Sequence, residues 1–147
     1  MCMSTDTNMY GYTRSRTFET YASRLSGNKN GLALVVYTEK LTDAAKNALE
    51  KSFAAIGFDA GACTYAQLEG LAPDEVFALV EGIDPLVLVA CDHDAADACS
   101  KAVRQAFPEM QRTRLFGREA RAFTRLNAML ETEATRQALW HLLKTMG

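Results

Sequence analysis

Two continuous apolar runs stand out in the hydrophobic pattern of this chain. Residues 32–37 (LALVVY) and 85–91 (PLVLVAC) carry no charge and are rich in β-branched side chains. Such runs are typical of strands that are buried on both faces of a sheet. A weaker run at residues 58–65 (FDAGACTY) predicts a further strand between them.

Between and after these runs, apolar residues recur every three or four positions, as on the buried side of a helix. One helix is predicted from Thr42 or Asp43 to a stop at Gly57, and a second from Pro73 to Gly82. A third helix follows the strand at 85–91 and ends at Pro108. A last helix is predicted over 132–146, and the residues that it buries are Ala138, Leu139, Leu142 and Leu143.

The two ends of this pattern are less regular. Residues 1–30 are polar, and we expect residues 1–14 to be mobile and residues 15–25 to form a short amphipathic helix that packs on the domain. The stripe of that helix consists of Phe18, Tyr21, Ala22 and Leu25. Near the other end, Gly117 indicates a turn, followed by an edge strand at 118–123 (REARAF) whose arginines point outward.

Alternating strands and helices predict a three-layer α/β fold with a short, mainly parallel sheet and helices on both faces. The pattern shows no linker that would divide residues 31–147, so we expect them to form a single α/β domain after the polar N-terminal segment.

Composition agrees with a soluble globular domain. The chain has 147 residues, of which 48% are hydrophobic and 23% charged, so a disordered chain or a collagen-like repeat is excluded. No apolar run is long enough to span a bilayer, and the N-terminus lacks the pattern of a secretion signal. We therefore expect a cytoplasmic protein without a membrane partner. Four cysteines form no C-x-x-C pair and are predicted to be free thiols: Cys2, Cys63, Cys91 and Cys99.

The net charge of −2 conceals a strong segregation of charge along the chain. Residues 1–30 carry +2, residues 31–100 carry −9, residues 101–125 carry +5, and the remainder is neutral. Arginine is well suited to bind phosphate or carboxylate groups, so a compact arginine block points to a partner. The residues of this arginine block are Arg112, Arg114, Arg118, Arg121 and Arg125. The alternative is a solvated surface, or ion pairs with the acidic body of the same chain.

A second candidate contact is the aromatic N-terminal segment, whose side chains are Arg14, Arg16, Phe18 and Tyr21.

The ends of the predicted strands offer another candidate site, because ligands bind at the carboxyl ends of parallel strands. Thr38 and Gln67 follow the first two strands, and Arg125 and Asn127 come after the last. The candidate ligand site within this group consists of Glu39, Tyr65, Cys91, Asp92 and His93. A histidine beside carboxylates suits acid–base or metal chemistry, and a cysteine near a helix N-terminus suits nucleophilic chemistry.

Each of these residues also has a structural interpretation. Asp92 and Asp94 lie where a helix begins, and a carboxylate caps such a position without any further function. Cys91 ends an apolar strand, where a buried thiol is common. The loop after the first strand contains no phosphate-binding glycines, and no G-x-S-x-G turn is present. We predict no cofactor, no metal and no catalytic residue.

Three longer segments follow one another in a recognisable order. Residues 49–68 read as a helix and a strand, residues 82–102 as a proline-led strand, a small turn and an alanine-rich helix, and residues 122–143 as a loop and a helix with a Leu-Trp pair. This order resembles the uracil-DNA glycosylase-like superfamily. The psi subunit of DNA polymerase III, a non-catalytic member of that fold, has a similar ALW-containing last helix.

The resemblance does not extend to the catalytic loops. TEKLTD at 38–43 lacks the glycine of the first loop of the active glycosylases, and TRLNAM at 124–129 lacks the Pro-Ser of their last loop. Cys91-Asp92 stands where they usually have Leu-Gly. The resemblance therefore implies the fold without the glycosylase chemistry, used for binding.

Together these observations favour a non-enzymatic α/β binding or adaptor module, in an assembly that handles DNA, with the arginine block on a protein partner or on phosphates. The main alternative is a small enzyme or ligand-binding protein that uses the strand ends. A homo-oligomer in which the arginine block meets the acidic body of the next copy is a third hypothesis.

Overall fold

A six-stranded mixed sheet forms the middle layer of the protein, whose computed structural model describes residues 5–146 and the side chains of residues 13–146. The strand order is β1-β3-β2-β4-β6-β5, and the four central strands are parallel. An antiparallel strand closes the sheet at each edge. The strands are β1 (Leu25–Gly27), β2 (Ala33–Tyr37), β3 (Cys63–Gln67), β4 (Val87–Ala90), β5 (Thr113–Leu115) and β6 (Arg118–Ala122).

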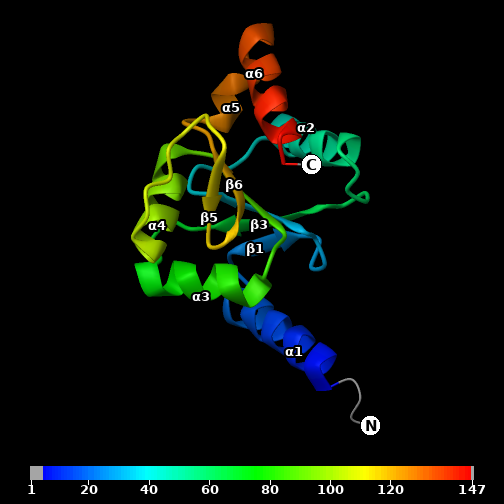
Figure 1. Cartoon of the computed structure of the whole chain (residues 1–147), viewed down its shortest axis with the longest axis vertical. Helices are drawn as coiled ribbons and strands as arrows, with labels where there is room; N and C mark the ends of the chain where they lie inside the picture. Colours follow the sequence, from blue (N-terminus) through cyan, green and yellow to red (C-terminus); the bar gives the residue numbers. More distant parts are fainter. Residues whose placement is uncertain (1–4, 147) are drawn as a thin grey trace.

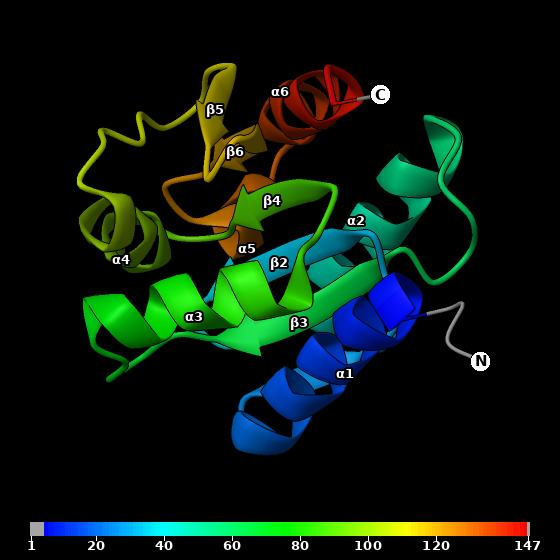
Figure 2. The same ribbon diagram turned by 60° about the horizontal axis from the view of Figure 1, so that its bottom comes forward.

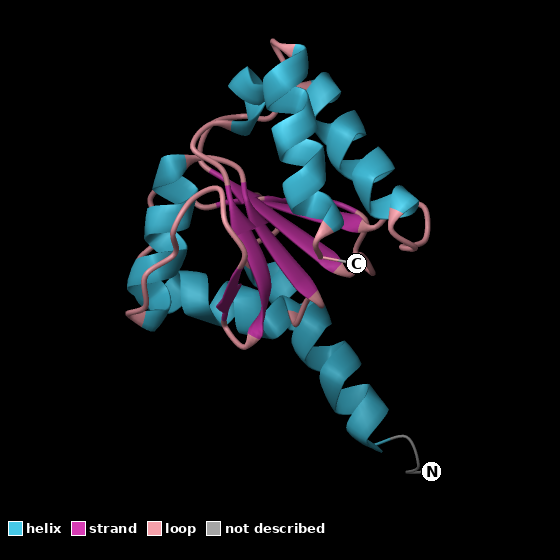
Figure 3. Cartoon of the chain, turned by 45° about the horizontal axis from the view of Figure 1, so that its top comes forward, coloured by secondary structure: helices cyan, strands magenta, loops and turns pink. Residues whose placement is uncertain are grey.

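Helices cover both faces of this sheet (Figures 1 and 3). One face carries α2 (Asp43–Ala55), α5 (Leu126–Met129) and α6 (Glu133–Lys144), and the other carries α1 (Thr5–Thr20), α3 (Pro73–Ile83) and α4 (His93–Val103). The expected three-layer α/β fold is therefore confirmed.

Alternation along the central strands divides the core into two layers. In β2, Ala33 and Val35 pack towards α2 and α6, whereas Leu34 and Val36 pack towards α3 and α4. All four residues are completely buried. A strand that is apolar on both faces can only lie inside the sheet, which is why the runs at 32–37 and 85–91 were sufficient to predict β2 and β4.

The N-terminal helix differs from its prediction. It spans Thr5–Thr20 rather than 15–25, and Leu25 lies in β1. Residues 5–14, which we expected to be mobile, belong to this helix, and residues 1–4 lie outside the described part of the chain. Phe18 and Tyr21 pack against the core on the α3 side, as predicted for the stripe. Figure 2 shows α1 next to α3.

The β5–β6 hairpin also corrects the prediction for residues 118–123. β6 pairs with β4 and with β5, so it lies inside the sheet and β5 forms the edge. Ala120 and Ala122 face the α3–α4 layer, so Arg121 faces the layer of α6.

Two helices differ from expectation as well, α6 in the residues that it buries and α4 in where it ends. Ala138 is exposed rather than buried, whereas Leu139 and Leu143 form the buried side of α6. α4 ends at Val103, before the predicted stop at Pro108, with Arg104 in the left-handed conformation. Among the described helices, none has both the length and the apolar character needed to cross a membrane.

Candidate functional site

The loops at the carboxyl ends of β2 and β4 meet, as the topology predicts, and Asp92 holds them together. One carboxylate oxygen accepts hydrogen bonds from the backbone N–H groups of Thr38 (2.8 Å) and Glu39 (3.0 Å). The other accepts from the hydroxyl of Thr38 (2.7 Å) and from the N–H of Ala95 (2.8 Å). Burial opposes ionisation, but the hydrogen bonds from Glu39 and Thr38 outweigh it and hold the pKa of Asp92 below its ordinary value. This carboxylate is therefore the cap of α4 and the link between two loops.

A second polar group lies next to Asp92. The Nε of Arg125 donates to both carboxylate oxygens of Glu39 at 3.0 Å, and the side-chain amide of Asn127 donates to the same carboxylate at 3.0 Å. Hydrogen bonding by Arg125, then by Asn127, lowers the pKa of Glu39. Its charge is thus neutralised within the protein.

His93 takes part in a separate, exposed contact. Its Nδ1 lies 2.8 Å from Glu109, and the other carboxylate oxygen of Glu109 accepts a hydrogen bond from the hydroxyl of Thr124 at 2.9 Å. This contact, followed by the charge of Glu109, raises the pKa of His93. The arrangement connects the start of α4 to the segment that leads into β5.

Two residues of the predicted ligand site lie elsewhere. The hydroxyl of Tyr65 donates to the carboxylate of Glu50 on α2 at 3.1 Å, so its side chain belongs to the layer of α2 and not to the loops at the strand ends. Cys91 is buried in the core between the sheet and the layer of α2 and α6, and burial raises the pKa of its thiol well above the ordinary value. The structure therefore brings Glu39, Asp92 and His93 to one edge and leaves Tyr65 and Cys91 out.

The His, Cys, Asp and Glu side chains also bear on metal and disulfide chemistry. No cluster of three or more His, Cys, Asp or Glu side chains within the described residues could hold a metal ion. Cys63, Cys91 and Cys99 are free and buried, as predicted, and Cys2 lies outside the described residues.

The arginine block does not form one outward surface. Arg121 is completely buried, so the prediction that it contacts a partner is wrong. Its guanidinium donates to the hydroxyl of Thr145 (2.9 Å), to the carbonyls of Thr113 (3.1 Å) and Ala120 (2.8 Å), and to the carboxylate of Glu119 (2.9 Å). These bonds attach the end of α6 to the β5–β6 hairpin.

Arg118 is also turned inward. Its guanidinium donates to Asp84 at 2.6 Å and to the carbonyl oxygens of Pro85 (2.7 Å) and Phe116 (2.9 Å). Arg114 is exposed but pairs with Glu119 at 3.1 Å. With Arg121 paired to Glu119 and Arg125 to Glu39, four of the five arginines form ion pairs with acids of the same chain, which was the stated alternative. The fifth, Arg112, is exposed.

The N-terminal candidate contact is partly structural. Arg14 donates to the carbonyl oxygens of Lys29 (2.6 Å), Gly31 (3.0 Å) and Ile83, and so attaches α1 to the end of α3. Phe18 and Tyr21 pack against the core. Arg16 is exposed on the same helix.

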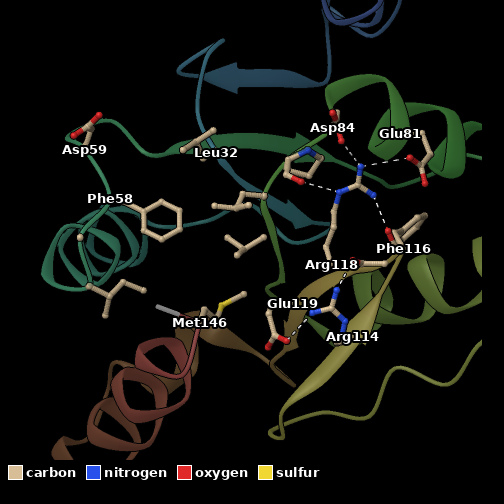
Figure 4. A pocket seen from close by; sticks show the side chains of 16 residues that line it. Leu32, Phe58, Asp59, Glu81, Asp84, Arg114, Phe116, Arg118, Glu119 and Met146 are labelled. Atoms are coloured by element: carbon tan, nitrogen blue, oxygen red, sulfur yellow. Dashed lines mark hydrogen bonds and ion pairs between the residues drawn. The ribbon is translucent and has the colours of Figure 1, made fainter. Parts of the chain in front are cut away.

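A groove that the sequence did not predict lies at the opposite, amino ends of the parallel strands (Figure 4). It has a volume of about 770 Å³. Leu32 and Leu86, which directly precede β2 and β4, are 52% and 59% exposed at this groove. Phe58 and Phe116 lie on opposite sides of it. We call this feature the amino-end groove; its remaining apolar lining comes from Ile56, Pro85, Val87 and Met146.

Phe116 occupies an unusual backbone position. The β5–β6 hairpin has a two-residue loop, Phe116-Gly117, in which both residues have positive φ, 55° and 74°. A hairpin turn of this kind favours Asn-Gly, and a bulky residue in the left-handed region is strained. Such strain is found preferentially where a side chain serves a function. The ring of Phe116 contacts Phe77 of α3, with 6.0 Å between ring centroids.

Charges at the rim of the amino-end groove are unbalanced. Arg118 pairs with Glu81 and Asp84, and Arg114 pairs with Glu119. The lining contains four acids and two arginines, because Asp59 adds a further acid on the side of Phe58. The rim therefore has an excess of negative charge around an apolar floor.

The position of this groove could not be read from spacing, because its lining comes from five separate segments of the chain. The available signals were the leucines that precede two strands and the Phe-Gly turn. Comparison of the sequence with models of protein families and with curated proteins finds no match.

Proposed function

We propose that this chain is a non-catalytic binding module that holds a segment of a partner protein in the amino-end groove. The observation that carries the proposal is Phe116, a strained turn residue that lines the groove together with exposed Leu32 and Leu86. Exposed apolar side chains gathered in one concave place are characteristic of protein interaction sites.

The charges of the groove indicate the chemistry of the partner. An apolar side chain would fill the space between Phe58 and Phe116, and a lysine or arginine next to it would face Asp59 and the acids around Arg118. A short segment with an apolar anchor and an adjacent cation therefore fits both the floor and the rim.

The strand ends favour binding over catalysis. The carboxylates of Asp92 and Glu39 accept hydrogen bonds from within the protein, and burial raises the pKa of the Cys91 thiol. Cys91 is thus neither exposed nor prone to ionise, and the oxygens of both carboxylates are already occupied by hydrogen bonds within the protein. From the resemblance of the sequence, we propose a uracil-DNA glycosylase-like fold without the glycosylase chemistry and a partner in a DNA-related assembly.

A peptide selection tests the proposal. A phage-displayed library of random 12-residue peptides is selected on the intact chain, and the enriched peptides are measured by fluorescence anisotropy. We expect peptides with an apolar residue next to Lys or Arg, and at least a tenfold weaker affinity for the double variant Leu32→Ser/Leu86→Ser. The matched control is Met110→Ser, which removes an exposed apolar side chain outside the groove.

Two results would contradict the proposal. One is that the enriched peptides bind the double variant with the same affinity as they bind the original chain and the Met110→Ser control. The other is that no peptide is enriched, while labelled single-stranded DNA binds with a steep salt dependence that Arg112→Ala reduces, because such binding reports phosphate contacts.

A further inference from the structure

The chain's only tryptophan lies on a second surface, formed by α2 and α6. Trp140 is 37% exposed at a depression of about 610 Å³ between these helices. Its floor is built from small and apolar side chains, namely Ala48, Ala55, Leu130 and Leu139. Large, partly exposed aromatic rings beside such a depression are the usual anchors of protein interfaces.

The charge of this surface is opposite to that of the amino-end groove. Lys51 from α2 and Arg136 from α6 line the depression, with Glu133 as the one acid of the lining. Lys144 places its ammonium 4.5 Å from the centre of the Trp140 ring. Cations thus gather here on a chain whose net charge is −2, so a partner with negative charge is favoured.

The shape indicates a helical occupant. α2 and α6 pack against each other, and the depression is lined by residues 48–55 of α2 and 133–140 of α6, so it follows each helix for about two turns, roughly 11 Å at 1.5 Å per residue. Two turns of a third helix fill such a space with apolar residues at i, i+3 or i+4, and i+7. Glutamate or aspartate beside these positions would face Lys51 and Arg136.

We infer that the α2–α6 surface binds an acidic amphipathic helix of a partner protein, with Trp140 as its anchor. The surface shares no lining residue with the amino-end groove, and its charge selects a different ligand. A chain with two such surfaces connects two partners and so acts as an adaptor. This inference stands independently of the proposed function.

Intrinsic fluorescence of Trp140 provides a direct measurement. Two helix-stapled peptides of 14 residues are titrated, with leucine at the same positions and with either glutamate or lysine at all the others. The expected result is a saturable change in fluorescence with the glutamate peptide, and at least tenfold weaker binding of the lysine peptide. Raising the salt concentration should weaken the glutamate peptide's binding.

Variants test whether the acidic peptide binds at this surface or is attracted by positive charges anywhere on the chain. Charge reversal in Lys51→Glu/Arg136→Glu should reverse the preference between the two peptides, and both residues are exposed, so the fold is retained. The matched control, Lys40→Glu/Arg112→Glu, reverses two exposed cations elsewhere and should leave the preference unchanged. Trp140→Ala, followed by anisotropy of a labelled peptide, should weaken binding at least tenfold.

Three outcomes would overturn the inference: no saturable binding of the glutamate peptide, equal binding of both peptides, or an unchanged preference in the charge-reversed variant. Leu32→Ser/Leu86→Ser should leave helix binding intact. If the original chain enriches no peptide at the groove but still binds the glutamate peptide, the proposed function fails and this inference stands.

Discussion

Asp92 and Thr38, 54 residues apart in the sequence, are joined by two hydrogen bonds at the carboxyl ends of adjacent parallel strands. In Asp92→Asn, one acceptor oxygen is replaced by an NH₂ group that faces backbone N–H donors. Because hydrogen bonds to a charged group contribute about 1.5–3 kcal/mol, we expect the free energy of unfolding at pH 7 to fall by about 2 kcal/mol. Urea denaturation measures this change, with Asp94→Asn as the control for charge at the same helix end.

The dependence on pH distinguishes the carboxylate from simple packing. The pKa of Asp92 lies below its ordinary value in the folded protein, so its charge stabilises the fold above the unfolded pKa of about 4. That contribution is lost as the pH falls further, through the folded pKa. The difference between the original chain and Asp92→Asn should therefore be constant from pH 5 to 7 and shrink towards pH 3. A constant difference down to pH 3 would contradict the role of the charge.

Arg121 should be essential to the fold rather than to binding. Removal of its completely buried guanidinium in Arg121→Ala takes a donor from the carbonyls of Thr113 and Ala120 and leaves Glu119 paired with Arg114 alone. A buried polar group left without its partner costs about 1–3 kcal/mol and the lost side chain leaves a cavity, so we expect a loss of about 3–5 kcal/mol by urea denaturation. Arg112→Ala removes an exposed arginine just before β5 and should change the free energy of unfolding by less than about 0.5 kcal/mol. Equal effects of the two variants would contradict this assignment.

The three layers could be predicted from the sequence, because a strand that is buried on both faces is a continuous apolar run, as in β2 and β4. The sequence was insufficient for α1 and β5. α1 is polar along most of its length, so its extent depends on contacts with α3, and β5 has only three residues that pair with β6. Residues 5–14 of α1 and the three residues of β5 therefore show no periodic pattern of apolar positions.

The candidate sites show the same limit. Spacing placed Glu39, Asp92 and Arg125 at one sheet edge, because the carboxyl ends of parallel strands meet there. Whether an arginine points outward depends on which face of β6 it occupies, and Arg121 shares its face with the end of α6. That contact joins residues from separate elements and cannot be inferred from either one alone.

Close packing of α1 on α3 requires glycine at position 82. A Cβ at Gly82 would overlap the side chain of Thr17, so Gly82→Ala should lower the free energy of unfolding by about 1–3 kcal/mol. Helix propensity alone predicts the opposite sign, since alanine favours a helix over glycine. The double variant Thr17→Ala/Gly82→Ala should recover part of the loss, which a double-mutant cycle measures. A stabilising effect of Gly82→Ala would contradict this close contact.

His93 should titrate above its ordinary pKa of about 6.5, because Glu109 forms a hydrogen bond to its ring and adds a negative charge. The contact therefore stabilises most when the ring is protonated at low pH, and its contribution is lost as the pH rises through the raised pKa. NMR titration of the ring should show a lower pKa in Glu109→Gln, and a smaller decrease in Asp94→Asn. His141→Gln assigns the two histidine signals. Equal decreases in the two acid variants would contradict a dominant role of Glu109.

Phe116 offers a test in which stability and binding change independently. Asparagine adopts positive φ more readily, and relief of a strain of about 1–3 kcal/mol should offset the loss of ring packing in Phe116→Asn. The variant should remain within about 1 kcal/mol of the original stability, whereas peptides selected on the amino-end groove should bind at least tenfold more weakly. The control is Phe77→Ala, which removes the partner ring on α3 but no lining residue of the groove. A large loss of stability in Phe116→Asn, with unchanged affinity, would assign the ring to packing and leave its strained position without a role in binding.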